Sequence, residues 1–239
     1  MFKLALDLPT MKVKKLKCDL ATCSMCKSCK PEWHKAIDVN RKLIHYNKGE
    51  SIFLEGDNVN GMYFIFSGLV KVHKKWSDNK ELILRFAKDG AIVGHRGLGG
   101  DTIYPVSATA LAASDICFVD LDFFMATLKV NPDYLFDLMM FFAAELKDSE
   151  KRMRNIAHMN TKGRIGQSLI TLQDKFGTDA DGFINIEISR QDLASYTGTT
   201  YETLFKIMNE LAEENAIHID SKRTKLLDNP KLLEYCKIE

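Results

Sequence analysis

Four cysteines near the start of the chain are spaced closely enough to bind one metal centre. Cys18, Cys23, Cys26 and Cys29 follow the pattern C-x4-C-x2-C-x2-C. Gaps of two residues allow a turn to bring neighbouring thiolates onto the same side, where they can bind one metal ion or one iron–sulfur cluster. Zinc needs only these four ligands, whereas a cluster can recruit a distant cysteine, for which Cys117 is the candidate. The alternative is a flexible arm whose thiols share no ligand.

A stretch near the C-terminal end has the pattern of a helix-turn-helix. Ser189 is suited to cap a short first helix, with Asp192 in the position of the capping-box acid, and Gly198 marks the turn. Thr199 or Thr200 can cap a second helix, whose apolar residues recur at three- and four-residue spacing. The polar face of that second helix is the surface that a DNA major groove would contact.

Residue types on this polar face can read DNA bases. A carboxylate accepts from cytosine N4 and a long cation reaches guanine O6 and N7, and Glu202 and Lys206 lie one turn apart. An ordinary surface helix with a Glu–Lys ion pair is the alternative. Two short strands around the basic turn 221–224 then favour a winged helix, whose cations would lie near phosphates. The residues expected at the DNA are Arg190, Thr199, Thr200, Tyr201, Glu202, Phe205, Lys206, Lys222 and Arg223.

Composition sets the outer limits of these interpretations. The 239 residues suffice for two domains with cores, and 46% hydrophobic with 27% charged residues is typical of a globular protein. A net charge of +1 means that DNA affinity must come from local clusters. No apolar run reaches the length of a membrane span, and the start of the chain lacks a signal-peptide pattern, so we expect a cytoplasmic protein without a membrane partner. In that reducing compartment, thiols, metal ligands or redox sensors are expected rather than structural disulfides.

Residues 43–121 have the pattern of an antiparallel β-roll. Short runs rich in β-branched and aromatic residues alternate with Gly, Asn and Asp turns at even spacing. Residues 90–101 carry five glycines, enough to let the backbone approach a ligand, but lack the ending of a phosphate-binding P-loop. The expected strands are 43–46, 51–54, 62–66, 69–73, 82–86 and 116–119.

From Pro132 to about Asn160 the hydrophobic period becomes that of a helix. Its first half is expected to pack on the roll of its own chain, and its second half against a copy of itself. The twofold symmetry of such a dimer suits palindromic DNA. The segment 161–163 is a candidate hinge before a helix over 164–176. The apolar residues expected on the dimer helix are Leu138, Phe142, Leu146, Met153 and Ile156.

A β-roll, a long helix and a winged helix in this order resemble the CRP/FNR superfamily of bacterial transcription regulators over nearly the whole chain. The resemblance implies a homodimer on palindromic double-stranded DNA, contact with RNA polymerase, and base reading by Glu202 and Lys206. Lys206 stands where most members have arginine, which keeps the charge but loses the fork that binds guanine. The resemblance is carried by the roll turns 48–50 and 55–57, the segments 63–71 and 90–97, and the segments 190–194 and 201–203.

The resemblance also indicates an effector pocket in the roll. In cyclic-nucleotide-binding members, a Glu after the loop glycine holds the ribose and an Arg-Ser pair holds the cyclic phosphate. Here His95 follows Gly94 and the pair reads Val106-Ser107, so cAMP is disfavoured because its phosphate loses charge-assisted bonds, which Arg96 would replace only in part. The candidate pocket residues are Gly94, His95, Arg96, Gly97, Val106 and Ser107.

The FNR branch of this family is a better match, since its members bind a [4Fe-4S] cluster with N-terminal cysteines plus one in the roll. Cys117 occupies the corresponding roll position, and Cys23-x2-Cys26 repeats the closely spaced pair. Cys29 departs from the family pattern because it follows after two residues instead of five, and Cys18 adds a further candidate ligand. The resemblance therefore favours a [4Fe-4S] cluster over zinc.

Together these features predict a non-enzymatic, homodimeric transcription regulator controlled by redox or oxygen. The expected fold is α+β, with an N-terminal β-roll of the cyclic-nucleotide-binding type, a long dimerisation helix and a C-terminal winged helix-turn-helix. A metal-free regulator that senses a nucleotide-like small molecule is the first alternative. A thiol redox enzyme is disfavoured because no Cys–His or acid–base group accompanies the cysteines. The expected parts are a cysteine-rich arm over 1–30, the roll over 31–131, the dimer helix over 132–160 and the DNA-binding domain over 161–239.

Overall fold

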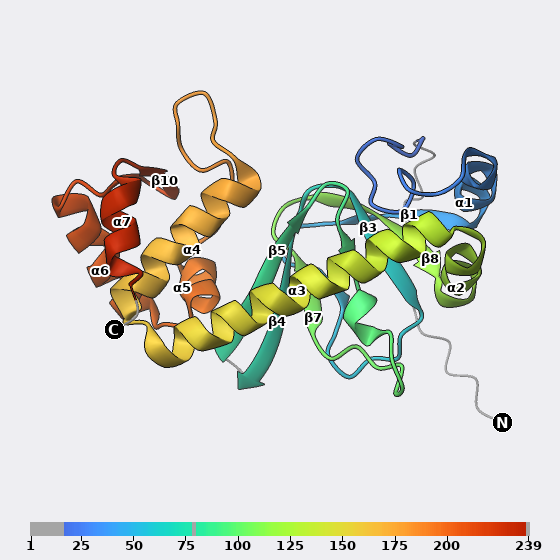
Figure 1. Ribbon diagram of the computed structural model, residues 1–239, viewed down its shortest axis with the longest axis horizontal. Helices are drawn as coiled ribbons and strands as arrows, with labels where there is room; N and C mark the ends of the chain where they lie inside the picture. Colours follow the sequence, from blue (N-terminus) through green and yellow to red (C-terminus); the bar gives the residue numbers. More distant parts are fainter. Residues whose placement is uncertain (1–16, 78–79, 238–239) are drawn as a thin grey trace. The chain divides into compact units, whose positions relative to one another are not determined.

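Two four-stranded sheets form the roll that the sequence predicts (Figure 1). One sheet has the strand order β1-β8-β3-β6 and the other β2-β7-β4-β5. The apolar runs supply the core between them: Met62, Phe64 and Ile65 of β3 are at most 1% exposed. The strands are β1 (Arg41–Tyr46), β2 (Ser51–Phe53), β3 (Gly61–Ser67), β4 (Leu69–Ser77), β5 (Lys80–Lys88), β6 (Ile92–Val93), β7 (Ser107–Ala110) and β8 (Ser114–Asp120).

This computed structural model describes residues 17–77 and 80–237. The described residues form two units, one made of 17–75 with 84–141 and the other of 76–77, 80–83 and 142–237. The first residues of the expected cysteine-rich arm, 1–16, lie outside the described residues.

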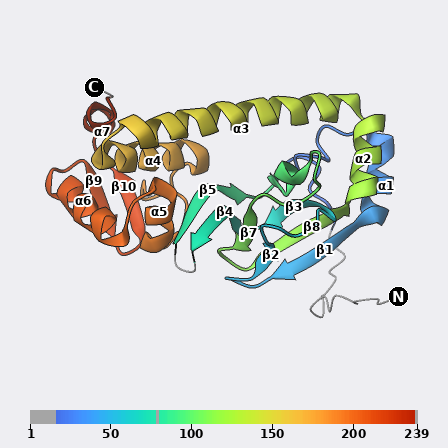
Figure 2. The same ribbon diagram turned by 90° about the horizontal axis from the view of Figure 1, so that it is seen from below.

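The first unit also contains helices that the sequence patterns did not reveal. The 3-10 turn η1 (Pro31–Trp33) and α1 (His34–Asn40) precede β1, and α2 (Leu121–Val130) follows β8. Figures 1 and 2 show α1 and α2 side by side. Trp33 joins the two segments, because its Nε1 donates to Thr127 Oγ1 at 3.1 Å and its ring stacks on Phe123 with centroids 5.9 Å apart.

The long helix α3 (Pro132–His158) begins at the proline that the sequence places in its first turn. Its first part, 132–141, belongs to the first unit and the remainder to the second. Leu138 is 5% exposed and lies in the core of its unit, whereas Leu146, Met153 and Ile156 are 60%, 65% and 47% exposed. No helix among the described residues combines the length and apolar character that a membrane crossing needs.

The second unit confirms the predicted helix-turn-helix and its wing. Ser189 caps α5 by accepting from the Asp192 N–H, Gly198 ends that helix in the left-handed conformation with φ 67°, and Thr200 caps α6. The antiparallel strands β9 and β10 form the wing. The elements are α4 (Thr161–Phe176), α5 (Arg190–Thr197), α6 (Tyr201–Glu213), β9 (Ile217–Asp220), β10 (Arg223–Leu226) and α7 (Asn229–Tyr235).

The predicted hinge over 161–163 is wrong, because these residues are the first turn of α4. The break between α3 and α4 lies just before these residues, at Asn160, whose side chain accepts a hydrogen bond from the Gly163 N–H. Gly163 serves close packing: a Cβ there would lie 2.2 Å from the carbonyl oxygen of Tyr235 in α7.

Candidate functional site

Three thiols of the cysteine loop, residues 17–30, lie within reach of one metal ion. The sulfur atoms of Cys18, Cys23 and Cys26 are all within 4.8 Å of one another, and Cys18 Sγ lies 3.2 Å from Cys26 Sγ. A local turn produces this grouping, since the N–H of Lys27 donates to the carbonyl of Cys23 at 3.1 Å. The two-residue gap therefore has the geometric effect that its spacing suggests.

The three thiols share too small a space to ionise independently. Hydrogen bonds from Cys18 and Cys26 lower the pKa of Cys23, while the hydrogen bond with Cys18 is the main cause that raises the pKa of Cys26. The hydrogen bond with Cys23 raises the pKa of Cys18 to about 12. Cys23 is thus the thiol favoured as the anion, and a bound cation would favour the anionic form of all three.

Cys117 in the roll meets the cysteine loop at a small pocket. Register pairs Cys117 of β8 with Leu43 of β1 and Phe64 of β3, which places it in the centre of its sheet. Arg41 Nη1 lies 3.6 Å from Cys117 Sγ. Burial raises the pKa of Cys117, and the nearby Arg41 partly opposes that rise. The pocket is lined by Cys18, Asp19, Thr22, Cys23, Phe64, Ile65, Phe66 and Cys117.

Cys29 lies outside the three-sulfur group but is also buried, at 6% exposed. Burial, with a smaller effect of the charge on Cys23, raises its pKa to about 12. Cys18, Cys23 and Cys117 therefore line one pocket, Cys26 joins the first two in the three-sulfur group, and Cys29 is a buried neighbour of that group.

Gly90 allows the cysteine loop to lie against the roll, a role that the sequence did not reveal. Gly90 has φ 82°, and a Cβ there would lie 2.1 Å from the carbonyl oxygen of Thr22. Its own carbonyl accepts from the Ser24 N–H at 2.9 Å. The first residue of the glycine-rich segment thus contacts the cysteine loop rather than leaving space for an effector.

The other side of the cysteine loop is bound to α2 and the start of α3. The Lys30 N–H donates to Asn131 Oδ1 at 2.8 Å, and Ser28 Oγ donates to Asp137 Oδ2 at 2.5 Å. His34, at the start of α1, has Nε2 2.9 Å from the carbonyl oxygen of Cys26, so it positions that cysteine through the backbone. A change in the loop is therefore connected directly to the first turns of α3.

Two of the predicted effector-pocket residues, Gly94 and Gly97, lie against the packed side chain of Tyr104, and others have partners within the first unit. A Cβ at Gly94 would lie 3.3 Å from Tyr104 Cε1, and one at Gly97 would lie 3.1 Å from Tyr104 Cδ1. Ser107 Oγ accepts from the Glu55 N–H at 2.9 Å, and the ring of His95 lies 5.1 Å from that of Phe141. Arg96 is half-buried and Val106 is buried. These glycines make room for Tyr104, which is 2% exposed.

The helix α6 exposes the residues predicted to read DNA. Tyr201, Glu202, Phe205 and Lys206 are all exposed, while Leu204, Met208 and Leu211 bury the opposite face. The rings of Tyr201 and Phe205 stack with centroids 6.4 Å apart. Lys206 Nζ is 3.9 Å from Glu210 Oε1, with the Lys206 side chain 78% exposed. Thr200 caps the helix and Thr199 is half-buried beside it.

Arg190 connects the helix-turn-helix to the wing. Its guanidinium donates to Thr224 Oγ1 at 3.2 Å and to the carbonyl oxygen of Ser221 at 3.1 Å. Burial lowers its pKa. Lys222 at the wing tip is exposed, and its Nζ lies 3.7 Å from the exposed carboxylate of Glu187.

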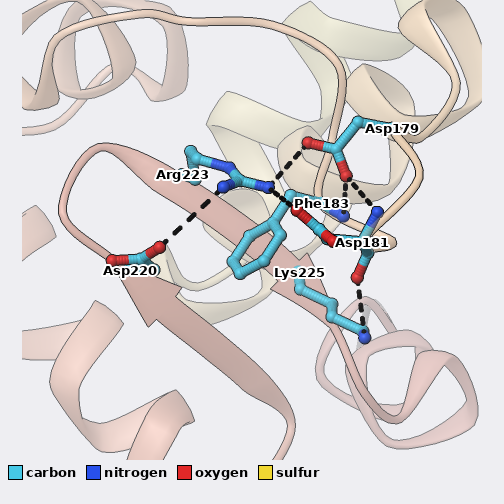
Figure 3. A network of polar contacts seen from close by, with 6 residues as sticks. All are labelled: Asp179, Asp181, Phe183, Asp220, Arg223 and Lys225. Atoms are coloured by element: carbon cyan, nitrogen blue, oxygen red, sulfur yellow. Dashed lines mark hydrogen bonds and ion pairs between the residues drawn. The ribbon is translucent and has the colours of Figure 1, made fainter.

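Arg223 is held in an acidic network within the second unit (Figure 3). Its guanidinium lies 2.8 Å from Asp179, 3.0 Å from Asp181 and 3.9 Å from Asp220, and packs 4.0 Å above the centroid of the Phe183 ring. Three carboxylates therefore offset the positive charge of Arg223, a residue that the sequence pattern places at the DNA.

The fold and these surfaces define a regulator with a β-roll, a long helix and a helix-turn-helix that binds DNA. Residues 43–131 match the cyclic nucleotide-binding domain, and residues 163–235 match the Crp-like helix-turn-helix domain. The chain belongs to the CRP/FNR superfamily of transcription regulators, and is accordingly not an enzyme.

Individual relatives agree with this assignment. The chain is 28% identical over 208 residues to the anaerobic regulatory protein of Bacillus subtilis, covering 86% of each chain. It is 29% identical over 183 residues to the cAMP-activated global transcriptional regulator CRP of Salmonella typhimurium, covering 74% of this chain and 85% of that one. Among solved structures, FixK2 from Bradyrhizobium japonicum matches with a TM-score of 0.74 and 20% identity, covering 83% of this chain and 98% of that chain.

Proposed function

We propose that this regulator senses redox state or oxygen through a metal centre held by the cysteine loop and Cys117. The observation that carries the proposal is the grouping of three sulfur atoms within 4.8 Å of one another beside a pocket that Cys117 also lines. A set of four thiol ligands suits an iron–sulfur cluster or zinc. Hard cations bind to oxygen ligands instead, and binding a nucleotide does not require thiols. The similarity to an anaerobic regulatory protein supports the hypothesis that the chain senses redox state or oxygen.

An iron–sulfur cluster is the centre we favour, with Cys18, Cys23, Cys26 and Cys117 as ligands and Cys29 as the buried neighbour. A bound cluster would supply a site that oxygen or a change of potential can alter. The guanidinium of Arg41, 3.6 Å from Cys117 Sγ, would offset part of the negative charge of such a centre. The chain's own contribution is to bury the centre, to fix its ligands and to transmit its loss.

A single zinc ion is the second candidate, because the three sulfurs are close together. Zn–S bonds of about 2.3 Å place two thiolates of a tetrahedral ion about 3.8 Å apart. The separations in this group, up to 4.8 Å, are near that value. A zinc centre would fix the loop on α3 without redox chemistry of its own.

We propose that α3 forms the seam of a homodimer. Apolar residues recur along it at alternating four- and three-residue steps, which is the pattern of a coiled-coil seam. Leu135 and Met139 are 47% and 55% exposed. They belong to this stripe, whereas Leu138, which the sequence pattern also assigns to the dimer helix, is buried in the core. The proposed seam comprises the apolar residues Leu135, Met139, Phe142, Leu146, Met153 and Ile156, with the polar Ser149 at the one remaining step.

In this proposal the helix α6 reads bases and the wing contacts phosphates. Glu202 and Lys206 are exposed on the first turns of α6, where a helix in the major groove contacts base edges. A dimer would place two such helices on a palindromic site. RNA polymerase is the further partner that the family assignment suggests.

The experiment that tests the sensor is purification of the full chain without oxygen, followed by quantification of iron, acid-labile sulfide and zinc together with the visible spectrum. Broad absorption that bleaches in air, with equal iron and sulfide and loss in Cys117→Ala, supports the cluster. Cys236→Ala is the matched control, because Cys236 Sγ donates to the carbonyls of Gly163 and Leu232 far along the chain from the loop. Stoichiometric zinc in place of iron supports the second candidate, and a protein with neither metal contradicts the sensor proposal.

A further inference from the structure

The hydroxyl of Tyr134, in the first turn of α3, is buried without a partner. The side chain is 2% exposed, and its hydroxyl makes no hydrogen bond within residues 17–77 and 80–237. Buried hydroxyls in folded proteins are normally hydrogen-bonded, since an unpaired one loses its bonds to water without replacement. An isolated buried hydroxyl thus points to a group that completes the site.

The surroundings of Tyr134 indicate what that group is. One side of the ring packs edge-on against Phe124, with centroids 6.2 Å apart. The cysteine loop is bound to residues on both sides of Tyr134 in the sequence, since the Lys30 N–H donates to Asn131 Oδ1 at 2.8 Å and Ser28 Oγ donates to Asp137 Oδ2 at 2.5 Å. Tyr134 is therefore buried in the turn of α3 that the cysteine loop contacts, and the sulfur of a bound metal centre is the acceptor that this loop can supply.

A second unpaired hydroxyl belongs to the same place. Ser24, next to Cys23, has a buried Oγ that also makes no hydrogen bond to any described residue. Elsewhere the buried tyrosine Tyr104 is satisfied, donating to the carbonyl oxygen of Gly61 at 2.7 Å. Unpaired hydroxyls on both the loop and α3 are what a protein site built around a further group would show.

We propose that Tyr134 donates a hydrogen bond from its hydroxyl to a sulfur atom of the metal centre, either a cysteine thiolate or a bridging sulfide. This inference rests on the proposed function, because the bound centre supplies the acceptor. A donated hydrogen bond stabilises negative charge on sulfur, so it favours the more reduced state of a cluster and slows its loss. Tyr134 is then a positioning residue that reports the state of the centre to α3.

The neighbouring residue makes this link relevant to regulation. Leu135 follows Tyr134 directly and is the first residue of the proposed dimer seam. If the centre is lost, the Tyr134 hydroxyl is again buried without an acceptor, which favours movement of this turn toward water. The same turn also holds Asp137, which accepts from Ser28 of the cysteine loop.

The test compares the wild-type chain with Tyr134→Phe, both purified without oxygen, and with Tyr104→Phe as the matched control. Iron, sulfide and zinc are quantified first. A cluster-containing protein is then titrated for its reduction potential and exposed to air to follow bleaching. A zinc-containing protein is instead mixed with a chromogenic chelator to follow metal release. Melting temperatures are measured with and without the metal.

We expect the Tyr134→Phe protein to bind the metal but to have a changed reduction potential and a faster loss of the metal. The reduction equilibrium should shift about tenfold toward the oxidised form, which equals 59 mV for a one-electron couple, and bleaching or zinc release should accelerate by a similar factor. The metal-free variant should melt at or above the wild-type temperature, since it lacks the unpaired hydroxyl, whereas the loaded variant should melt below the loaded wild type. Tyr104→Phe should leave the potential and the release rate unchanged.

Two results separate the failure of this inference from that of the proposed function. A metal-loaded Tyr134→Phe protein with wild-type potential, release rate and melting difference overturns the hydrogen bond and leaves the sensor standing. Wild-type protein without iron or zinc overturns both. If the variant does not fold, a shift of the iron–sulfur stretching bands of wild-type protein between H2O and D2O decides the matter, and its absence counts against the hydrogen bond.

Discussion

Arg223 and Lys222 of the wing have different surroundings and should have different roles. We expect Arg223→Ala to lower the melting temperature by roughly a few degrees, because it removes the cation from a network of three carboxylates and an aromatic ring. Lys222→Ala should leave the melting temperature unchanged and lower the slope of log affinity against log salt by about one per protomer. Calorimetry and DNA titrations at several salt concentrations measure these two effects.

Comparison of the Arg223→Ala and Lys222→Ala variants can also contradict these roles. Arg223→Ala could instead lower the slope of log affinity against log salt as much as Lys222→Ala does, and melt like the wild type. That result would show that the acidic network does not hold the Arg223 side chain, and that Arg223 contacts phosphate as the sequence predicts. Sequence alone could not separate these two cations, since Asp179 and Asp181, which pair with Arg223, come from a loop more than forty residues earlier in the chain. Glu202 and Lys206 were easier to place because their partners and spacing are local to one helix.

The exposed apolar stripe of α3 should hold two chains together. We expect Met153→Glu to raise the dimer dissociation constant roughly 100-fold, because a charge in each helix would have to be buried in the seam. Lys147→Glu is the matched control, since Lys147 is exposed on a different side of the same helix. Light scattering across a dilution series measures the mass, and a Met153→Glu protein that stays dimeric at nanomolar concentration would place the interface elsewhere.

Elements were predictable from the sequence to the extent that their signals are local. The caps of α5 and α6 and the turn at Gly198 agree with the sequence because each depends on neighbouring residues. Strand β7 was missed because Thr109 is the one β-branched residue among Ser107 to Ala110, too weak a local signal, and pairing with β2 and β4 makes the segment a strand. The position of Gly90 against Thr22 depends on packing between distant segments, which periodicity does not record.

The state of the metal centre should control DNA affinity through α3. The cysteine loop is tied to the first turns of α3 by Ser28 with Asp137 and by Lys30 with Asn131. We expect oxygen-free protein to bind a double-stranded sequence selected from a random pool about tenfold more tightly than air-exposed protein, a typical magnitude for coupling between two sites. Mobility shifts measure the affinity, and light scattering on the same samples measures the dimer.

Variants of single cysteines distinguish this coupling from general oxidation. Cys26→Ser should bind DNA weakly with or without oxygen, because it removes a ligand of the centre, whereas Cys236→Ser should respond to air like the wild type. The two variants remove the same chemical group, so a difference between them assigns the effect to the centre. Equal loss of affinity in both, or an unchanged dimer mass on exposure of the wild type to air, would show that the signal reaches the DNA-binding helices by a route other than the α3 seam.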